Sequence, residues 1–346
     1  AGDMKTEDYL KLSENEKAKC REQYKLPDEQ YAAIKTLIRF IWENPELSNQ
    51  EFETSRKQTE FLKQNGFAVT SPYCGKPTAY RAEFRNEADK PCFAFCAELD
   101  ALPGMGHACG HNLISGNAIT AALIAKQQII RENIQGKIVV LGCPAEETDG
   151  GKIDMAEAGA IEDIDALMLA HPISGDHALY DTGYAGSRIA KIYYHGEGGS
   201  GVARCANPKY VNPLDAQNLL YQAVALRRHY TPHDLALIGC ITNGGERANM
   251  IPVMTSSIYT IRSQNLEHLL QAAEMLKEMA EGAAMMTGTK LQFELTGRYQ
   301  PTLPCHPLSD IFLDAAQACG IPEVRNGRGG LNFACTDFGN LSQDRK

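Results

Sequence analysis

The first regular pattern along the chain is helical. Apolar residues recur every three or four positions from Tyr31 to Ile41, which predicts an amphipathic helix with one stripe facing the core. A second helix is expected over residues 53–64, because Asn65 and Gly66 are residue types that commonly end a helix. The residues before Pro27 are charged and weakly patterned, so these two helices are the first predicted elements of the core.

Short apolar runs then alternate with helical stretches. The strand-like runs are residues 92–97, 138–142 and 166–170, and a helix is predicted over 113–132 between the first two. This alternation is typical of an α/β fold with a mostly parallel sheet and helices on its faces. Because ligands of such sheets bind beyond the carboxyl ends of the strands, a site is expected directly after these runs.

The pattern changes after Gly186. Strand, helix, strand, strand, helix and strand are predicted in that order, which is the ferredoxin-like arrangement. The six segments are 188–194, 213–229, 235–242, 255–261, 266–286 and 290–295. This order predicts a discontinuous larger domain of residues 1–186 and 298–346, into which a smaller α+β domain of residues 187–297 is inserted. The returning segment is expected to contain a helix near 308–318.

Composition narrows the class of protein and its partners. The 346 residues are 43% hydrophobic and 22% charged, which excludes a globally disordered or low-complexity chain. The net charge of −9 opposes binding to nucleic acid or to an anionic membrane. No apolar run approaches the roughly 18 residues of a spanning helix, and the polar start AGDMKTEDYLKLSENEKAK is not a signal peptide. We therefore expect a cytoplasmic protein whose eleven scattered cysteines are mostly reduced core thiols.

Residue types that bind metals follow each of the three apolar runs. They are, in order, Asp100, His107, Cys109 and His111 within ELDALPGMGHACGHN, Glu146 and Glu147 within CPAEETDGG, and His171. Because neighbouring parallel strands end at the same edge of a sheet, these residues can meet in one crevice. Thiolate, imidazole and carboxylate together are the ligand set of zinc or a similar divalent ion.

The mixture of ligand types indicates a catalytic rather than a structural metal site. A structural zinc site would be richer in cysteine and closed, whereas two adjacent carboxylates leave room for water. Adjacent side chains of an extended segment point in opposite directions, so one of Glu146 and Glu147 can bind metal while the other faces the bound water as a general base. Water activated in this way is the usual nucleophile for an unactivated amide. The number of candidate ligands favours two ions.

Each cluster also has a plainer interpretation. The HACGH triplet alone can be ordinary loop residues, a glutamate pair is often a solvated surface feature, and a histidine before a proline often just closes a strand. Three such clusters at three consecutive strand ends are much less expected by coincidence than any one of them. Their combination therefore favours a site.

At these residues the chain resembles the aminoacylase and carboxypeptidase superfamily of di-metal amidohydrolases. Within it, the hippurate, auxin-conjugate and aminobenzoyl-glutamate hydrolases are the most similar subgroup. The resemblance extends over about residues 31–340 and is carried by DALPGMGHACGHN, CPAEE, the AGA that follows residues 153–157, and LAHP. It implies the same fold and a hydrolase that uses two divalent ions, zinc or manganese.

The resemblance also implies roles for individual residues. Cys109 and His111 match the metal ligands of HACGH, and His171 matches the ligand of the AHP motif. Glu146 matches the general base of the glutamate pair and Glu147 its metal ligand. In addition, Asp100 falls where relatives place an acidic residue that supports the metal ligands.

The inserted domain is similar to the lid through which relatives dimerise, which implies a homodimer. Its segment NGGERANMIPVMTSSIYTIRS resembles the stretch whose asparagine and arginine reach the substrate, here Asn249 and Arg262. A guanidinium fork is suited to a carboxylate, in agreement with an N-acyl amino acid as substrate. The plainer alternative for Arg262 is a surface ion pair on a strand.

Two features depart from the family pattern. Relatives carry a lid histidine that stabilises the developing oxyanion, whereas this chain has GEGGSGVARCANP with Ser200 near that position. Loss of one such donor costs on the order of 10²- to 10³-fold in rate. The family's last metal-binding histidine lies beyond TDFGN, where this sequence ends at LSQDRK. The expectation is therefore either a shortened chain or a second metal that is weakly held or absent.

Three functions are compatible with these observations. The first is a metal-dependent hydrolase, of aminoacylase or dipeptidase type, that cleaves the amide of N-acyl amino acids or dipeptides. The second is a catalytically impaired relative that acts as a binding or assembly protein, because the lid and terminal histidines are not found. The third uses Cys109 and His171 as nucleophile and base, which leaves the glutamate pair without a role.

Overall fold

The computed structural model describes residues 13–201, 209–321 and 323–343. The chain divides into two compact units, of which the first comprises Ala1–Thr182 with Pro304–Arg328. The second comprises Gly183–Leu303 with Gly329–Lys346. Assignment of these units to a catalytic domain and a lid, with the boundaries expected from the sequence, stays a prediction.

The first unit is built on a mixed sheet of five strands. In spatial order these are β1 (Ala68–Thr70), β2 (Tyr80–Asn86), β4 (Gly136–Cys143), β3 (Cys92–Glu98) and β5 (Ala166–Met168). Strand β3 pairs in parallel with both β4 and β5, whereas β2 pairs antiparallel with β1 and β4. The expectation of a mostly parallel sheet is therefore corrected to a mixed sheet, parallel only where the three predicted strands lie.

Strand β2 was not predicted because charged residues interrupt its pattern. Arg81 is buried within it, and its guanidinium donates to an Asp163 carboxylate oxygen at 2.7 Å and to the Ala160 carbonyl oxygen at 3.0 Å. A buried charge is tolerated only when it is paired and hydrogen-bonded. These partners lie far along the chain, so local sequence did not reveal the strand.

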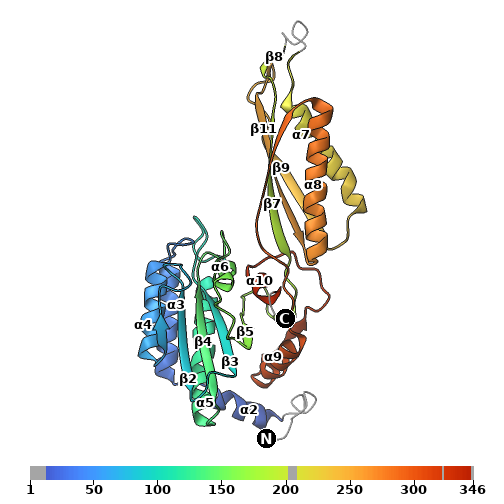
Figure 1. Cartoon of the computed structure of the whole chain (residues 1–346). Helices are drawn as coiled ribbons and strands as arrows, with labels where there is room; N and C mark the ends of the chain where they lie inside the picture. The colour runs from blue at the N-terminus through green and yellow to red at the C-terminus, as the bar shows by residue number, and fades with distance from the viewer. Residues whose placement is uncertain (1–12, 202–208, 322, 344–346) are drawn as a thin grey trace. The chain divides into compact units, whose positions relative to one another are not determined.

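Three helices pack on this sheet around one hydrophobic core. They are α3 (Asp28–Glu43), α4 (Phe52–Gln64) and α5 (His111–Arg131), and they agree with the predicted helices (Figure 1). Ile41, Leu62 and Ile119, one from each helix, are fully buried in that core. The remaining elements of the first unit are α2 (Glu14–Gln23), α6 (Gly151–Glu157), β6 (Ala178–Tyr180), α9 (His306–Ala318) and β13 (Val324–Asn326).

The second unit contains an antiparallel sheet of four strands. In spatial order these are β12 (Lys290–Thr296), β7 (Gly186–His195), β11 (Met254–Ser263) and β9 (Leu235–Asn243). Helices α7 (Pro213–Arg227) and α8 (Leu266–Thr287) lie side by side on one face of the sheet (Figure 1). Along β11, buried positions alternate with half-buried ones, because every second side chain faces these helices.

The main elements of this unit follow one another as strand, helix, strand, strand, helix and strand, in the order expected from the sequence. Between them lie the short strands β8 (Gly199–Ser200) and β10 (Met250–Ile251), which pair with each other, and the 3₁₀ helix η2 (Arg228–Tyr230). The helix α10 (Phe338–Gln343) also belongs to this unit.

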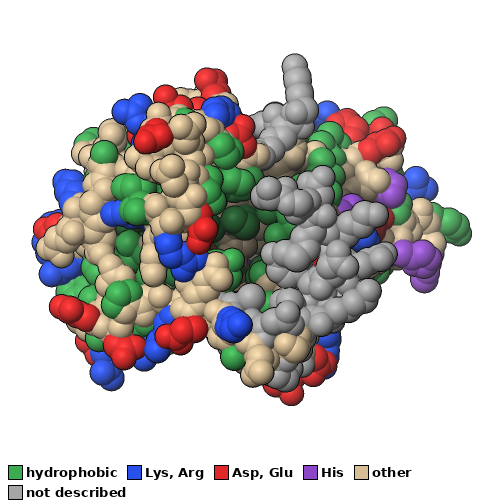
Figure 2. Space-filling model, turned by 90° about the horizontal axis from the view of Figure 1, so that it is seen from below, with side chains coloured by type: hydrophobic (Ala, Val, Ile, Leu, Met, Phe, Trp, Pro, Cys, Tyr) green, Lys and Arg blue, Asp and Glu red, His purple; other side chains and the backbone are tan. Residues whose placement is uncertain are grey.

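The surface carries charges of both signs. Figure 2 shows acidic and basic side chains interspersed over the described part of the face in view. Within the described residues, no helix is long and apolar enough to cross a membrane. None of the cysteines that the structure describes forms a disulfide, but Cys240, Cys305 and Cys319 are exposed rather than core residues.

Candidate metal centre

The carboxyl ends of three adjacent strands lead into the candidate site. Because β3 pairs in parallel with β4 and β5, these strands end at the same edge of the first unit's sheet (Figure 1). Glu98 at the end of β3 is paired in register with Cys143 at the end of β4. The loops that follow these ends carry the metal-ligand residue types found in the sequence.

One group of potential ligands comprises Cys109, His111 and His171. Their ligand atoms all lie within 4.8 Å of one another, and Cys109 Sγ is 3.4 Å from His171 Nε2. The imidazoles of His111 and His171 lower the pKa of the Cys109 thiol, which favours the metal-binding thiolate. Gly110 permits this packing, because its φ is 83° and a Cβ there would lie only 2.5 Å from Pro172 Cγ.

A second group shares His111 with the first. Its other members are Glu146 and Glu147, and the three ligand atoms again lie within 4.8 Å of one another. His111 Nε2 is 3.6 Å from Glu147 Oε1 and 3.9 Å from Glu146 Oε2. Two overlapping ligand groups around one histidine are compatible with two neighbouring ions.

Glu98 is a site residue that was not predicted from the sequence. Its Oε2 lies 3.3 Å from His111 Nε2, and its Oε1 accepts a hydrogen bond from Lys152 Nζ at 2.6 Å, with both side chains fully buried. Burial acts to raise the pKa of Glu98, but Lys152 and His111 lower it below its ordinary value, so this carboxylate stays charged. The signal was its place as the first polar residue after the 92–97 run.

Asp100 orients both His111 and the glutamate pair. His111 Nδ1 lies 2.7 Å from the Asp100 carbonyl oxygen, which can only accept, so Nδ1 donates there and Nε2 faces the carboxylates. The Asp100 carboxylate accepts from the backbone N–H groups of Glu146 at 3.2 Å and Glu147 at 3.0 Å. Burial opposes ionisation, yet the hydrogen bonds from His111 and Ser48 lower the pKa of Asp100 to about 2.

The arrangement fits a divalent cation. Three buried atoms near the centre make no hydrogen bond within the described residues, namely Glu98 Oε2, His111 Nε2 and Glu147 Oε1. Buried polar atoms are normally hydrogen-bonded, so the convergence of these three atoms fits the binding of a cation. Burial acts to lower the pKa of His111, but the hydrogen bond with Asp100, the nearby Cys109 and the charge of Glu98 raise it to about 11, in agreement with negatively charged surroundings.

His107 does not join either ligand group, although it lies in the same sequence motif. It is buried, and neither ring nitrogen has a hydrogen-bond partner in the described part of the chain. Burial, together with the charge of His111, lowers its pKa to about 4, so the ring is neutral at pH 7. His107 is therefore an uncharged residue near the site and belongs to neither ligand group.

The family model for peptidase family M20/M25/M40 matches residues 94–346. The chain belongs to this peptidase family. Every residue of the two ligand groups lies within the matched range. This M20 family member is a metal-dependent hydrolase of amide or peptide bonds, as its relatives are. The finding supports the first of the three functions and not a catalytically impaired binding protein.

Individual proteins and one solved structure are similar to most of this chain. The Xaa-Arg dipeptidase of Mus musculus is 34% identical over 334 residues, which are 91% of this chain and 75% of the relative. A p-aminobenzoyl-glutamate hydrolase chain of Escherichia coli (strain K12) is 27% identical over 303 residues, which are 82% and 62% of the two chains. The YXEP protein of Bacillus subtilis, a dinuclear metal binding peptidase, has the same fold, with a TM-score of 0.74 at 21% identity over 92% and 87% of the two chains.

The two predicted substrate-binding residues of this M20 protein lie far apart within the second unit. Asn249 is exposed just before β10, and its carbonyl oxygen accepts from the Gly201 N–H at 2.8 Å. Arg262 lies near the distant end of β11, where its Nη1 donates to the Phe333 carbonyl oxygen at 2.8 Å. The intervening length of β11 corresponds to roughly 25 Å. The two side chains therefore do not share a pocket in this unit.

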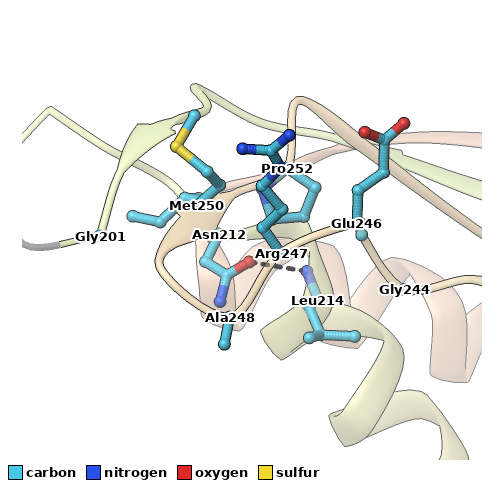
Figure 3. A pocket seen from close by; sticks show the side chains of 11 residues that line it. Gly201, Asn212, Leu214, Gly244, Glu246, Arg247, Ala248, Met250 and Pro252 are labelled. Atoms are coloured by element: carbon cyan, nitrogen blue, oxygen red, sulfur yellow. Dashed lines mark hydrogen bonds between the residues drawn. The ribbon is translucent and has the colours of Figure 1, made fainter.

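A cavity of about 390 Å³ lies beside Asn249. Figure 3 shows its lining, in which the side chains of Asn212, Leu214 and Met250 surround the hollow and Arg247 and Glu246 extend from the adjoining loop. Asn212 is the N-cap residue that precedes α7, and its Oδ1 accepts from the Leu214 N–H at 3.1 Å. Ser200, near the position expected for the lid histidine, pairs with Met250, and the following loop 202–208 lies outside the described residues.

Proposed function

We propose that this M20 protein hydrolyses dipeptides and N-acyl amino acids, with Xaa-Arg dipeptides as the first substrates to test. The observation that carries the proposal is the pair of overlapping ligand groups that share His111, of which the second includes Glu146. The choice of substrate is supported by the 34% identity with the Xaa-Arg dipeptidase, which the match covers over 75% of its length.

We propose two divalent ions, zinc in preference to manganese. Cys109, His111, Glu147 and His171 are their protein ligands in this proposal. The thiolate and imidazole groups favour zinc, whereas the carboxylates are compatible with manganese. Glu98 adds a further negative charge beside His111, which supports a strongly cation-binding site.

When bound, a divalent ion supplies a polarised water and a Lewis acid for the amide carbonyl. The residues of the chain provide the remaining steps. Glu146 removes a proton from the attacking water and delivers it to the leaving amine, as a general base and then a general acid. The Asp100 carboxylate accepts from the backbone N–H of Glu146. This hydrogen bond keeps the Glu146 carboxylate in position beside His111. Arg262 is proposed to bind the substrate carboxylate, because its Nε is buried without a hydrogen-bond partner in the described residues.

Removal of metal is the direct test of this function. We expect a chelator to abolish hydrolysis of Xaa-Arg dipeptides and N-acetyl amino acids, and zinc or manganese to restore it. The ion should also stabilise the fold, by about 2.7 kcal/mol at about 100 times its Kd, because it binds only the folded arrangement of ligands. Turnover and thermal unfolding are measured together with elemental analysis of the purified chain. Hydrolysis that persists after the metal has been removed would contradict the proposal.

We further propose a homodimer formed through β9. This edge strand spans nine residues, LALIGCITN, without charge or proline. Unprotected edges of this kind usually pair with another strand. A second argument comes from the separation of Asn249 and Arg262, because a dipeptide is much shorter than roughly 25 Å of strand. We infer that two copies contribute these side chains to each site.

A lysine on this edge should prevent dimer formation. We expect Ile238→Lys to convert a dimer into a monomer in sedimentation or light-scattering measurements, because a charge opposes pairing of the two edges. Ile311→Lys is the matched control, since Ile311 on α9 is 63% exposed and Ile238 is 67% exposed. A wild-type monomer, or an Ile238→Lys dimer, would refute pairing through β9.

We place the protein in the cytoplasm, with a small molecule as its substrate. Reduced thiols support this location, because none of the described cysteines is paired in a disulfide and several are exposed. The net charge of −9 and the mixed surface charges support a partner other than nucleic acid or an anionic membrane.

A further inference from the structure

A buried carboxylate outside both ligand groups contacts the loop that carries Glu146. Glu51 lies at the start of α4, and its side chain is fully buried. Its Oε1 accepts from the backbone N–H groups of Ala145 at 3.0 Å and Asn49 at 2.8 Å, and its Oε2 accepts from Thr78 Oγ1 at 2.8 Å. Burial raises the pKa of Glu51, although these hydrogen bonds act to lower it. Both oxygens of the Glu51 carboxyl group thus accept hydrogen bonds from other residues of the protein.

Ala145 has a backbone conformation that is unusual for a residue with a Cβ. Its φ is 57°, in the left-handed region that glycine adopts most easily. Such a conformation persists only when the surroundings hold it. Here the Ala145 N–H donates to Glu51, and the Ala145 carbonyl oxygen accepts from the N–H groups of Gly150 at 3.0 Å and Gly151 at 3.3 Å. The residue is therefore held on both sides.

The left-handed turn directs three consecutive N–H groups to two buried carboxylates. The Ala145 N–H donates to Glu51, whereas those of Glu146 and Glu147 donate to Asp100. Successive backbone N–H groups in such a turn form binding sites for negative charge. Asp100 also contacts the candidate ligand His111. The Glu51 side chain, in contrast, links the backbone of this loop to Asn49 and Thr78 and makes no hydrogen bond to a candidate ligand.

We propose that Glu51 is a positioning residue, which holds Ala145 in the left-handed turn and thereby aims the Glu146 carboxylate. This inference rests on the proposed function, in which Glu146 is the general base. A general base acts only within hydrogen-bond reach of the proton that it removes. A small displacement of Glu146 therefore slows the chemical step and leaves substrate binding nearly unchanged.

The test compares two substitutions of Glu51. Glu51→Met keeps the length of the side chain and removes both acceptors, and we expect kcat to fall on the order of 10²-fold with KM nearly unchanged. Glu51→Gln retains an acceptor for the Ala145 N–H, while the Thr78 hydroxyl can turn to accept from the new amide. We expect Glu51→Gln to retain most of kcat. Wild-type kcat in Glu51→Met, or a loss of more than about tenfold in a folded Glu51→Gln protein, would overturn the proposal.

A second comparison separates positioning from a general structural role. Glycine adopts the left-handed region without the cost that alanine bears. The loss caused by Glu51→Met should therefore be about tenfold smaller in an Ala145→Gly background than in the natural one, a coupling that a double-mutant cycle measures. An equal loss of kcat in both backgrounds would show that Glu51 only stabilises the core, and it would refute the inference. Loss of bound metal as the main effect would refute it as well.

Hydrogen exchange gives a measurement that is independent of turnover. We expect the amides of residues 145–151 to exchange faster in Glu51→Met and at nearly the natural rate in Glu51→Gln, because only the former loses the acceptor. Unchanged exchange in Glu51→Met would overturn the proposed contact. If the natural protein shows no hydrolysis while exchange changes as expected, the proposed function fails and the role of Glu51 in holding the loop stands.

Discussion

Replacement of Glu146 by glutamine should lower kcat by about 10²- to 10⁴-fold, because the residue proposed as general base can no longer remove a proton from the attacking water. The amide has nearly the same size as the carboxylate, and the backbone N–H of residue 146 can still donate to Asp100. We therefore expect the variant to fold, to retain its metal and to keep a similar KM. Steady-state kinetics and elemental analysis of the same preparation measure both effects.

Glu147→Gln is the matched comparison, because it makes the same chemical change at the adjacent position. We expect it to lose metal affinity, since Glu147 Oε1 is one of the buried atoms that face His111 Nε2. A Glu146→Gln protein with full activity would contradict the assignment of the base. It would favour instead a nucleophilic Cys109 with His171, and loss of activity in Cys109→Ser at full metal occupancy would then be the deciding observation.

Replacement of Lys152 by methionine should destabilise the first unit by about 3–5 kcal/mol, because it removes the lysine that is hydrogen-bonded to the buried charge of Glu98. Lys152 Nζ and Glu98 Oε1 are 2.6 Å apart, and both side chains have no exposed surface. Glu146 and Glu147 lie near the same histidine as Glu98, so the Glu98 carboxylate without Lys152 would share His111 with two like charges. Urea unfolding of the metal-free protein measures the loss.

An exposed ion pair provides the control. Lys90 and Asp165 are also 2.6 Å apart, but the two side chains are 56% and 41% exposed. We expect Lys90→Met to cost less than about 1 kcal/mol, because surface pairs are screened by water. The second substitution Glu98→Gln in the Lys152→Met protein should recover part of the stability, since it removes the unpaired charge. Equal effects of Lys90→Met and Lys152→Met would refute a structural role for the buried pair.

Elements with a strong local pattern were predictable from the sequence. The apolar stripe of residues 31–41 corresponds to α3, whose buried residues include Ile34, Leu37 and Ile41. The strands and helices of the second unit were likewise expected in their observed order, because each alternates or repeats with the period of its own structure. Strand β2 was not predicted, since Arg81 is buried there through partners on other segments.

Local sequence also located the candidate ligands of this M20 peptidase. Their residue types follow directly after apolar runs, and the parallel pairing of β3, β4 and β5 brings those runs to one edge. The local sequence did not reveal Glu98 as a site residue, because the buried Lys152 that donates to Glu98 is 54 positions away. The contact of Glu51 was not predicted for the same reason. Glu51 accepts a hydrogen bond from the N–H of Ala145, which is 94 positions away along the chain.

The residue types of the site and their order along the chain are thus properties of the sequence, because each follows an element whose periodicity is local. The tertiary structure alone decided that His111 is shared by two ligand groups, that Glu98 and Lys152 form a buried pair, and that Glu51 accepts from the N–H of Ala145, whose backbone is left-handed. Such contacts depend on burial, which strengthens charge interactions and makes an unpaired polar group costly. Burial depends on how distant segments pack against one another, so it cannot be predicted from a local sequence pattern.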